Sequence, residues 1–260
     1  MRVRRPWQLF WGGVLVLAGI LFLLNTMGVL SFSVWGVLWP LFLIIAGVFI
    51  LLGFNSRWWG AGEAERVMLP LEGAERASIH VEGTAGVFTL KAASEETPNA
   101  LVVGDFYGGV EFKTSHHQGE LVVRMKPPAF SGGNWEFGIK KGIPVRLKLD
   151  GGAGPAELDL TDLHVTELKT DGRAGPLTIH MPAQVPYLKA KIDGGLGPIT
   201  ITMPEGVAAR ISYSSGLGSQ QVAGRYMLVG ENTYESPDFA TSERKIEMKI
   251  DGGIGGFTVR

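Results

Sequence analysis

Three copies of one pattern lie close together in the second half of the chain: LKLDGGAGPAELDL (Leu147–Leu160), LKTDGRAGPLTIHM (Leu168–Met181) and AKIDGGLGPITITM (Ala190–Met203). Each copy has alternating apolar residues, an aspartate, a glycine-rich stretch and a second alternating segment. Alternation with period two is typical of a strand with one buried face. Glycine permits the positive φ angles that a tight corner needs. Each copy therefore predicts a strand, a tight corner and a second strand.

The same pattern extends to both sides of these copies. The chain ends in MKIDGGIGGFTVR (Met248–Arg260), a weaker copy begins at Ile211, and IHVEGTAGVFTL from Ile79 and LVVGDFYGGVEF from Leu101 fit upstream. The aspartate position recurs every 21, 22 or 24 residues before a final interval of 37, at Glu82, Gly104, Lys126, Asp150, Asp171, Asp193, Ser214 and Asp251. Because a fixed period is typical of repeat architectures, the sequence predicts about eight two-strand repeats of 21–22 residues.

We interpret the aspartates and glycines of the clearest corners as structural, because glycine tolerates unusual φ angles and aspartate can hydrogen-bond the backbone of its own turn. The predicted turn residues are Asp150, Gly151, Gly154, Asp171, Gly172, Gly175, Asp193, Gly194, Gly197, Asp251, Gly252 and Gly255. A row of aspartates also permits a calcium interpretation. Calcium needs about six to eight converging oxygens, however, and D-G-G-x-G differs from the calcium-binding nonapeptide repeat. The sequence therefore favours structural corners without a metal or cofactor.

A single repeat buries too little apolar surface to fold alone, so the repeats must pack on one another. Stacking them about 4.8 Å apart gives a continuous apolar interior, which predicts an all-β domain resembling a β-solenoid. A two-sheet antiparallel sandwich is the alternative that the same patterning allows. The constant period favours the stack.

The N-terminal part of the chain has a different composition. Its first 60 residues contain four of the 24 basic residues and none of the 25 acidic residues, and they include two apolar runs, Leu9–Leu30 and Val34–Phe54. Each run is long enough to cross a bilayer as a helix at about 1.5 Å per residue. We therefore predict a transmembrane α-helical hairpin at residues 1–54, with spans at about 9–30 and 34–54. A linker at 55–66 and the β-repeat domain at 67–260 follow.

Charge predicts the orientation of this hairpin and excludes some functions. Arg2, Arg4 and Arg5 precede the first span and Arg57 follows the second, so both termini and the β domain are predicted to be cytoplasmic. The residues after Gly60 hold all 25 acidic and 20 of the 24 basic residues, a formal charge of about −5. Such a domain lacks the basic surface that nucleic-acid binding requires. No catalytic set converges in the sequence, and no G-K-[ST] follows a glycine corner, so we do not expect an enzyme.

Two segments break the period and are the predicted interaction regions. One is Lys126–Lys141, and the other surrounds the sequence RYMLVGENTYESPDF, because insertions in repeat proteins often form binding loops. A cap over the flank of the stack is the alternative for the second segment. The candidate interaction residues are Phe130, Trp135, Tyr226, Tyr234 and Phe239. The last predicted strand, Gly256–Arg260, has no capping helix, so we expect an exposed edge for a homo-oligomer or a strand-adding partner.

The two apolar runs, GGVLVLAGILFLLNTMGVL and VWGVLWPLFLIIAGVFILLG, resemble the small transmembrane module of the LiaF-like proteins of the bacterial cell-envelope stress response. The D-G-G-x-G corners resemble the toast-rack or adhesin-like β domain attached to such modules. The resemblance implies a protein of the cell membrane whose partners, besides the lipid bilayer, are other membrane or signalling proteins, such as a sensor kinase and its response regulator. Better-studied regulators of this family commonly have four spans, whereas two are predicted here.

We therefore expect a non-enzymatic, membrane-anchored regulatory or scaffold protein of the envelope stress response that acts through protein–protein contacts of its β domain. The alternative is a surface-facing, adhesin-like module that binds cell wall or extracellular polymer. A self-assembling structural rack is a third hypothesis. The side of the membrane on which the β domain lies discriminates between the first two.

Overall fold

The computed structural model of the chain describes residues 64–128, 131–214 and 216–260. By its internal contacts the chain divides into two units, residues 1–58 and 59–260, and every element below belongs to the second. Both predicted membrane spans lie outside the described residues. Within the described part of the chain, no helix is long and apolar enough to cross a bilayer. This part is all-β, as the repeat pattern predicts.

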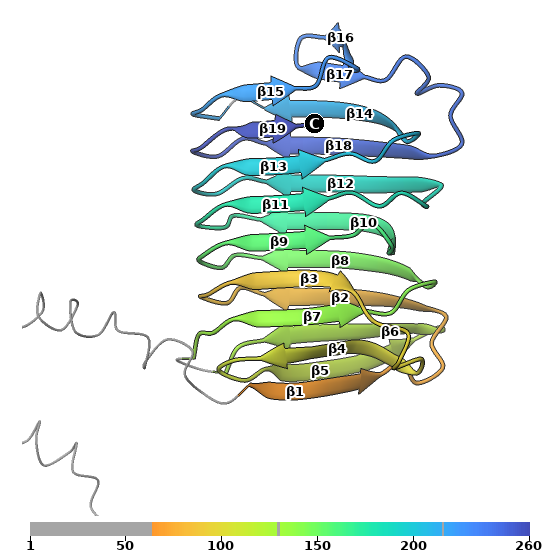
Figure 1. Cartoon of the computed structure of the whole chain (residues 1–260), viewed down its shortest axis with the longest axis vertical. Coiled ribbons are helices and arrows are strands. Elements are labelled where there is room, and N and C mark those ends of the chain that lie inside the picture. The colour runs from red at the N-terminus through yellow and green to blue at the C-terminus, as the bar shows by residue number, and fades with distance from the viewer. Residues whose placement is uncertain (1–63, 129–130, 215) are drawn as a thin grey trace, which may run out of the picture. The chain divides into compact units, whose positions relative to one another are not determined.

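The strands form two mixed sheets (Figure 1). The ten-stranded sheet has the order β16 (Met227–Gly230), β17 (Thr233–Glu235), β14 (Ala208–Ser214), β18 (Lys245–Asp251), β12 (Tyr187–Asp193), β10 (His164–Asp171), β8 (Pro144–Asp150), β2 (Arg76–Glu82), β6 (Glu120–Lys126) and β5 (Glu111–His117). The nine-stranded sheet has the order β1 (Glu65–Pro70), β4 (Ala100–Phe106), β7 (Trp135–Ile139), β3 (Phe88–Ala92), β9 (Ala156–Asp159), β11 (Leu177–His180), β13 (Ile199–Thr202), β19 (Phe257–Val259) and β15 (Gln220–Val222).

Most of the domain is a stack of parallel coils. Each coil has one strand in the ten-stranded sheet, a corner, and one strand in the nine-stranded sheet, and equivalent strands of neighbouring coils pair in parallel. In spatial order the coils are β6–β7, β2–β3, β8–β9, β10–β11, β12–β13, β18–β19 and β14–β15. The parallel pairing agrees with the predicted solenoid-like stack. Antiparallel strands occur toward the two ends of the sheets, at β1, β4 and β5 and at β16 and β17.

The spatial order of the coils differs from their order in the sequence. The first coil, β2–β3, lies between β6–β7 and β8–β9, and the last coil, β18–β19, lies between β12–β13 and β14–β15 (Figure 1). The interval of 37 residues before Asp251 therefore has a topological reason. In the sequence, β14–β15 follows β12–β13 but does not pair with it. The β16–β17 hairpin comes next, and β18–β19 then lies between these two coils.

This topology corrects the prediction for the C-terminal strand. We expected Gly256–Arg260 to be an exposed edge, but β19 pairs with β13 on one side and β15 on the other. The backbone groups of β19 are therefore already used within the chain. An oligomer formed by addition of a strand to this edge is excluded by the pairing.

The repeat predicted at Gly104 is also wrong. Gly104 lies inside β4, which pairs antiparallel with β1 and β7, and not in a corner between two parallel strands. A Cβ atom at Gly104 would lie 2.3 Å from Cβ of Phe137 on β7. This glycine is therefore explained by a close contact between neighbouring strands, and the turn comes later, at Gly108 and Gly109, with φ angles of 82° and 83°.

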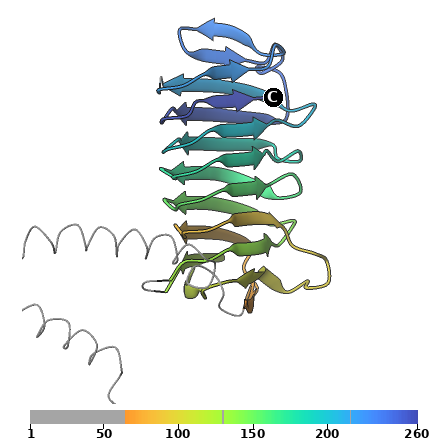
Figure 2. The same ribbon diagram turned by 60° about the vertical axis from the view of Figure 1, so that its left-hand side comes forward.

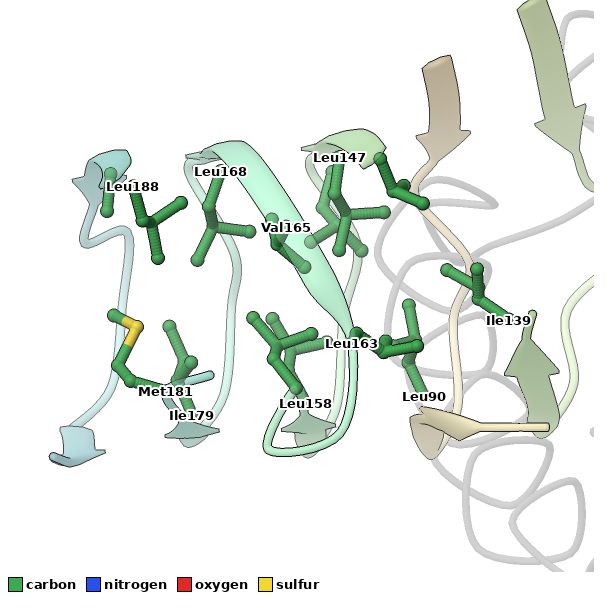
Figure 3. Close-up of a cluster of buried hydrophobic side chains, with 14 of the residues drawn as sticks. Leu90, Ile139, Leu147, Leu158, Leu163, Val165, Leu168, Ile179, Met181 and Leu188 are labelled. Carbon is green, nitrogen blue, oxygen red and sulfur yellow. The ribbon is translucent and has the colours of Figure 1, made fainter. Parts of the chain in front are cut away.

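The core lies between the two sheets and continues from coil to coil. Figure 3 shows Leu147, Leu168 and Leu188 of the ten-stranded sheet facing Leu158 and Ile179 of the nine-stranded sheet, and all five side chains are buried. Their alternation with exposed residues along each strand matches the period-two pattern of the sequence. The charged residues between them therefore face outward, where they can form functional surfaces.

Candidate functional site: the corner ridge and the charged face beside it

The glycine corners align along one edge of the stack (Figure 1). Gly175 and Gly197, the last glycines of their corners, have φ angles of 134° and 135°. A Cβ atom at Gly175 would lie 2.5 Å from the carbonyl oxygen of Gly154, and one at Gly197 would lie 2.5 Å from that of Gly175. Equivalent glycines of neighbouring coils are thus in direct backbone contact. Both the φ angle and the contact explain why glycine stands at these corners.

The aspartates lie where the strands of the ten-stranded sheet end, but their side chains bond differently from our prediction. Asp150 Oδ2 accepts hydrogen bonds from Lys148 Nζ at 2.7 Å and pairs with His80 Nε2 of the neighbouring coil at 2.5 Å. Asp251 Oδ1 accepts a hydrogen bond from Ser214 Oγ at 2.7 Å, again across coils. Among the described residues, these carboxylates therefore connect strands and do not bond the backbone of their own turns.

The pKa of Asp150 reflects these contacts. Partial burial by itself would raise the pKa of this carboxyl group, but the hydrogen bonds from Lys148 and His80 and their charges outweigh burial and hold the pKa below its usual value. The carboxylate is therefore the favoured form of Asp150.

The residue before the last glycine of each corner forms an exposed apolar line, which we call the corner ridge. Isolated parallel bridges connect these residues from coil to coil, in the order Ala85, Ala153, Ala174, Leu196, Ile254 and Leu217. The last three are large and stand out from the surface, with exposed fractions of 57% for Leu196, 55% for Ile254 and 73% for Leu217. An exposed apolar patch of neighbouring side chains is typical of an interaction site.

An acidic row runs beside the ridge at the ends of the strands of the ten-stranded sheet. Glu82 is in register with Asp150, Asp150 with Asp171, and Asp193 with Asp251. In the described residues, no group of three or more histidine or carboxylate side chains is arranged to hold a metal ion. The row forms a line of carboxylate side chains along one side of the ridge.

Two further rows of charge lie on the outer face of the same sheet. The row next to the acidic one is basic and passes through Lys113, Arg124, His80, Lys148, Lys169, Lys191 and Lys249 in register. The following row alternates in sign through Arg146, Glu167, Lys189, Glu247, Arg210 and Glu235. Ion pairs such as Arg146–Glu120 and Arg210–Glu235 connect part of this face, and open hollows flank Arg146.

The structure places most of the predicted interaction residues in the interior. Trp135 is buried and packs edge to face against Phe106, with ring centroids 5.3 Å apart. Tyr226 and Phe239 are also buried, and Tyr234 is partly buried and stacks on Tyr213. Trp135, Tyr226 and Phe239 are thus core residues and do not offer an exposed contact surface. Phe130 lies outside the described residues.

The segment that was expected to form a binding loop or a flank cap is mainly a hairpin. Its strands, β16 and β17, extend the ten-stranded sheet beyond β14 at one end of the stack. It therefore covers an end and not a flank.

The corner ridge was missed because its residues were assigned to turns. The signal was nevertheless in the sequence, since the variable position of D-G-G-x-G changes from alanine to leucine or isoleucine toward the C-terminus.

Fold and ridge together define a class of protein, the β-repeat domain that presents an extended surface along a rigid stack. Residues 60–202 match the family model described as the N-terminal domain of toast_rack, and the chain therefore belongs to the toast-rack family. Residues 9–51 match the LiaI-LiaF-like transmembrane region. These two matches support the resemblance to LiaF-like proteins and a location in the membrane.

Two solved structures are also matched. A candidate cell adhesion protein from Clostridium sporogenes matches with a TM-score of 0.68 and 20% sequence identity, over 76% of this chain and 98% of its own. A candidate adhesin from Bacteroides fragilis gives a TM-score of 0.33 and 7% identity over 78% of this chain and 99% of its own. The likeness to the Clostridium sporogenes protein is one of fold. No curated protein gives a significant match.

Proposed function

We propose that this toast-rack protein is a non-enzymatic regulator or scaffold of the cell-envelope stress response, anchored by two spans, with its β domain in the cytoplasm. The family and the transmembrane match support the membrane anchor and the general process. The single observation that carries the mode of action is the corner ridge. Its three large aliphatic side chains stand exposed on consecutive coils, where they can contact another protein.

The chemistry beside the ridge indicates what kind of partner fits. Asp193 and Asp251 end the strands that lead into the corners of Leu196 and Ile254. A partner segment on the ridge would therefore bury aliphatic side chains and meet carboxylates directly beside them. We expect a protein segment with apolar and basic residues, because burial of apolar surface supplies affinity and complementary charge supplies specificity.

The stack provides a rigid support for such a contact. Ile192 and Ile250 lie one residue before Asp193 and Asp251, on the buried side of their strands, and both are fully buried. Equivalent corner glycines are in backbone contact across coils. Leu196 and Ile254 therefore keep fixed positions relative to each other. Binding a partner then costs less conformational entropy, because the surface is already ordered.

The test uses the full-length chain in its host bacterium. A strain without the protein is compared with strains that carry the natural chain, Leu196→Asp with Ile254→Asp, or Ser115→Asp on the opposite end of the domain. The transcriptional response to a cell-wall-active antibiotic is measured. The deletion is expected to change this response, and the ridge variant is expected to fail to restore it. The control at Ser115, which is exposed on β5, should restore it.

Two outcomes contradict the proposal. An unchanged antibiotic response in the deletion strain would exclude a regulatory role. Full restoration by the ridge variant, at equal protein levels, would exclude the ridge as the contact surface. If the deletion instead weakens attachment of cells to cell wall or polymer, and the β domain lies outside the cell, the adhesin-like function would replace the regulatory one.

A further inference from the structure

Four strands form the outer edges of the two sheets, and one of them differs from the others. The edge strands are β1 and β15 in the nine-stranded sheet and β16 and β5 in the ten-stranded sheet. β1 and β5 carry charged residues, and β15 has two glutamines. β16 reads MLVG and has neither a charged nor a polar side chain. Proteins usually protect sheet edges with charge or proline, so β16 is an unprotected edge.

The side chains of β16 are exposed on both faces of the sheet. The exposed fractions are 55% for Met227, 59% for Leu228 and 56% for Val229. The hairpin of β16 and β17 lies beyond β14–β15, the outermost coil at this end of the stack, and has no counterpart in the nine-stranded sheet (Figure 2). Leu228, which is in register with Tyr234, is therefore not covered by a second layer. Both the backbone edge and its apolar side chains lack a partner within the described chain.

The sequence around β16 is complementary to itself in antiparallel orientation. Pairing two copies about Leu228 places Leu228 opposite Leu228 of the partner copy and Met227 opposite Val229. Arg225 and Glu231 lie in the turns just outside β16, and the same register would bring these opposite charges toward each other at both ends of the pair. Opposite charges and apolar pairs in directly facing positions stabilise antiparallel strands. Both side chains are exposed, although Arg225 Nη2 also donates a hydrogen bond to the carbonyl oxygen of Met203 at 3.0 Å.

We infer that β16 is a self-association edge, through which two copies of this chain join their ten-stranded sheets by antiparallel β16–β16 pairing about a two-fold axis. An isologous contact of this kind uses the same patch on both copies and closes as a dimer. Because β1 and β5 lie at the other end of the stack, the N-terminal strands of the two copies would be separated by about 90 Å, estimated from some twenty strands at 4.8 Å each. This inference goes beyond the proposed function; it rests on the membrane anchor but not on the regulatory role.

The contact is small, and the membrane compensates for its size. A strand of four residues and three aliphatic side chains bury less than the roughly 800 Å² per partner of a standard stable interface. The register of β16 against β17 also shifts between Leu228 and Gly230, which limits the length of a regular ladder. Anchoring in one membrane raises the effective concentration of the copies, so a weak contact suffices. We therefore expect the dimer in membranes and not in dilute detergent.

The test exploits the absence of cysteine from the chain. Full-length Leu228→Cys is oxidised in native membranes, and in parallel treated with a short bis-maleimide. Facing residues of an antiparallel pair have Cβ atoms about 4.5–5.5 Å apart, so a product of twice the 28.0 kDa chain mass is expected. Leu217→Cys, which is more exposed but lies at a corner, is the matched control and should give little of this product.

A second experiment tests the register and excludes random collision. Differently tagged Met227→Cys and Val229→Cys chains are expressed together and should cross-link to each other more than each does to itself. Adding Leu228→Lys to both chains should lower the yield about tenfold or more, since like charges would face each other. Equal yields from Leu228→Cys and Leu217→Cys, or no effect of Leu228→Lys, would overturn the inference. So would cross-linking of β16 to another protein in place of its own copy.

Discussion

The guanidinium group of Arg173 fills the space beside the α-carbon of Gly152, where a Cβ atom would lie 2.5 Å from Nη1 of Arg173. Arg173 belongs to the corner between β10 and β11, and Gly152 to the equivalent corner of the preceding coil. Nη1 donates a hydrogen bond to the carbonyl oxygen of Gly151 at 3.1 Å, and Nη2 donates one to that of Gly154 at 3.3 Å. Burial lowers the pKa of this guanidinium. One corner is therefore stabilised by a side chain from the next.

This contact predicts an energetic coupling between the two residues. Gly152→Ala should destabilise the fold by roughly 1–3 kcal/mol, because alanine is strained at the φ angle of 109° and meets Arg173. In an Arg173→Gly background the same change should cost less, since only the strain and a contact of 3.1 Å with the carbonyl oxygen of Thr84 remain. Denaturant unfolding of the four chains of a double-mutant cycle measures the difference. Additive effects would show that the contact contributes nothing.

The pH dependence of stability should include a contribution from Asp150. Its pKa is lowered in the folded state by Lys148 and His80, so its stabilising effect is complete above the unfolded-state pKa of about 4 and is lost as the pH falls through the lower folded-state value. Asp150→Asn should therefore reduce stability at neutral pH and flatten the acid part of the profile. Melting temperatures between pH 2 and 6, with Asp193→Asn as the matched control, check this. A variant profile parallel to that of the natural chain would contradict it.

The coil β18–β19 is the last in the sequence but lies between two other coils. We therefore expect its core residues to contribute as much to the stability of the fold as those of other interior coils. Ile250 of β18 and Ile192 of β12 are both fully buried and in register with each other. Each substitution to alanine should cost about 2–5 kcal/mol. Leu217→Ala, at an exposed ridge position, should have little effect. If Ile250→Ala cost much less than Ile192→Ala in denaturant unfolding, β18 would behave as an end strand and the intercalated order would be wrong.

The orientation of the β domain can be measured with one introduced thiol. Ser115 is exposed on β5, and the chain has no cysteine, so Ser115→Cys is the only site for a membrane-impermeant reagent. We predict labelling only after the cells are permeabilised, because the arginines that flank the predicted spans favour a cytoplasmic β domain. Ala190→Cys, at a buried position, controls for labelling of unfolded protein. Labelling of Ser115→Cys in intact cells would place the domain outside and favour the adhesin-like function.

The local structure could be predicted from the sequence because it depends on neighbouring residues. Alternation around Leu147 and Leu149 determines which face of the strand is buried, and the glycines of D-G-G-x-G permit corners that few other residues allow. The pattern around Gly104 misled the prediction, because a glycine needed for contact with Phe137 is identical in sequence to a corner glycine. Trp135 was assigned to a binding loop because the segment Lys126–Lys141 breaks the period, whereas it begins strand β7.

By itself, the sequence determined that the chain has an apolar N-terminal part followed by two-strand repeats that must share a core. Only the tertiary structure decided the order in which the coils stack, since equivalent strands such as β12, β14 and β18 have compatible patterns and each could pair with another. Pairing across coils also decided that Leu196, Ile254 and Leu217 form one ridge, although 37 residues separate Leu217 from Ile254 in the sequence. Local chemistry fixes a strand and its corner, whereas long-range pairing fixes which surfaces come together and which edges stay free.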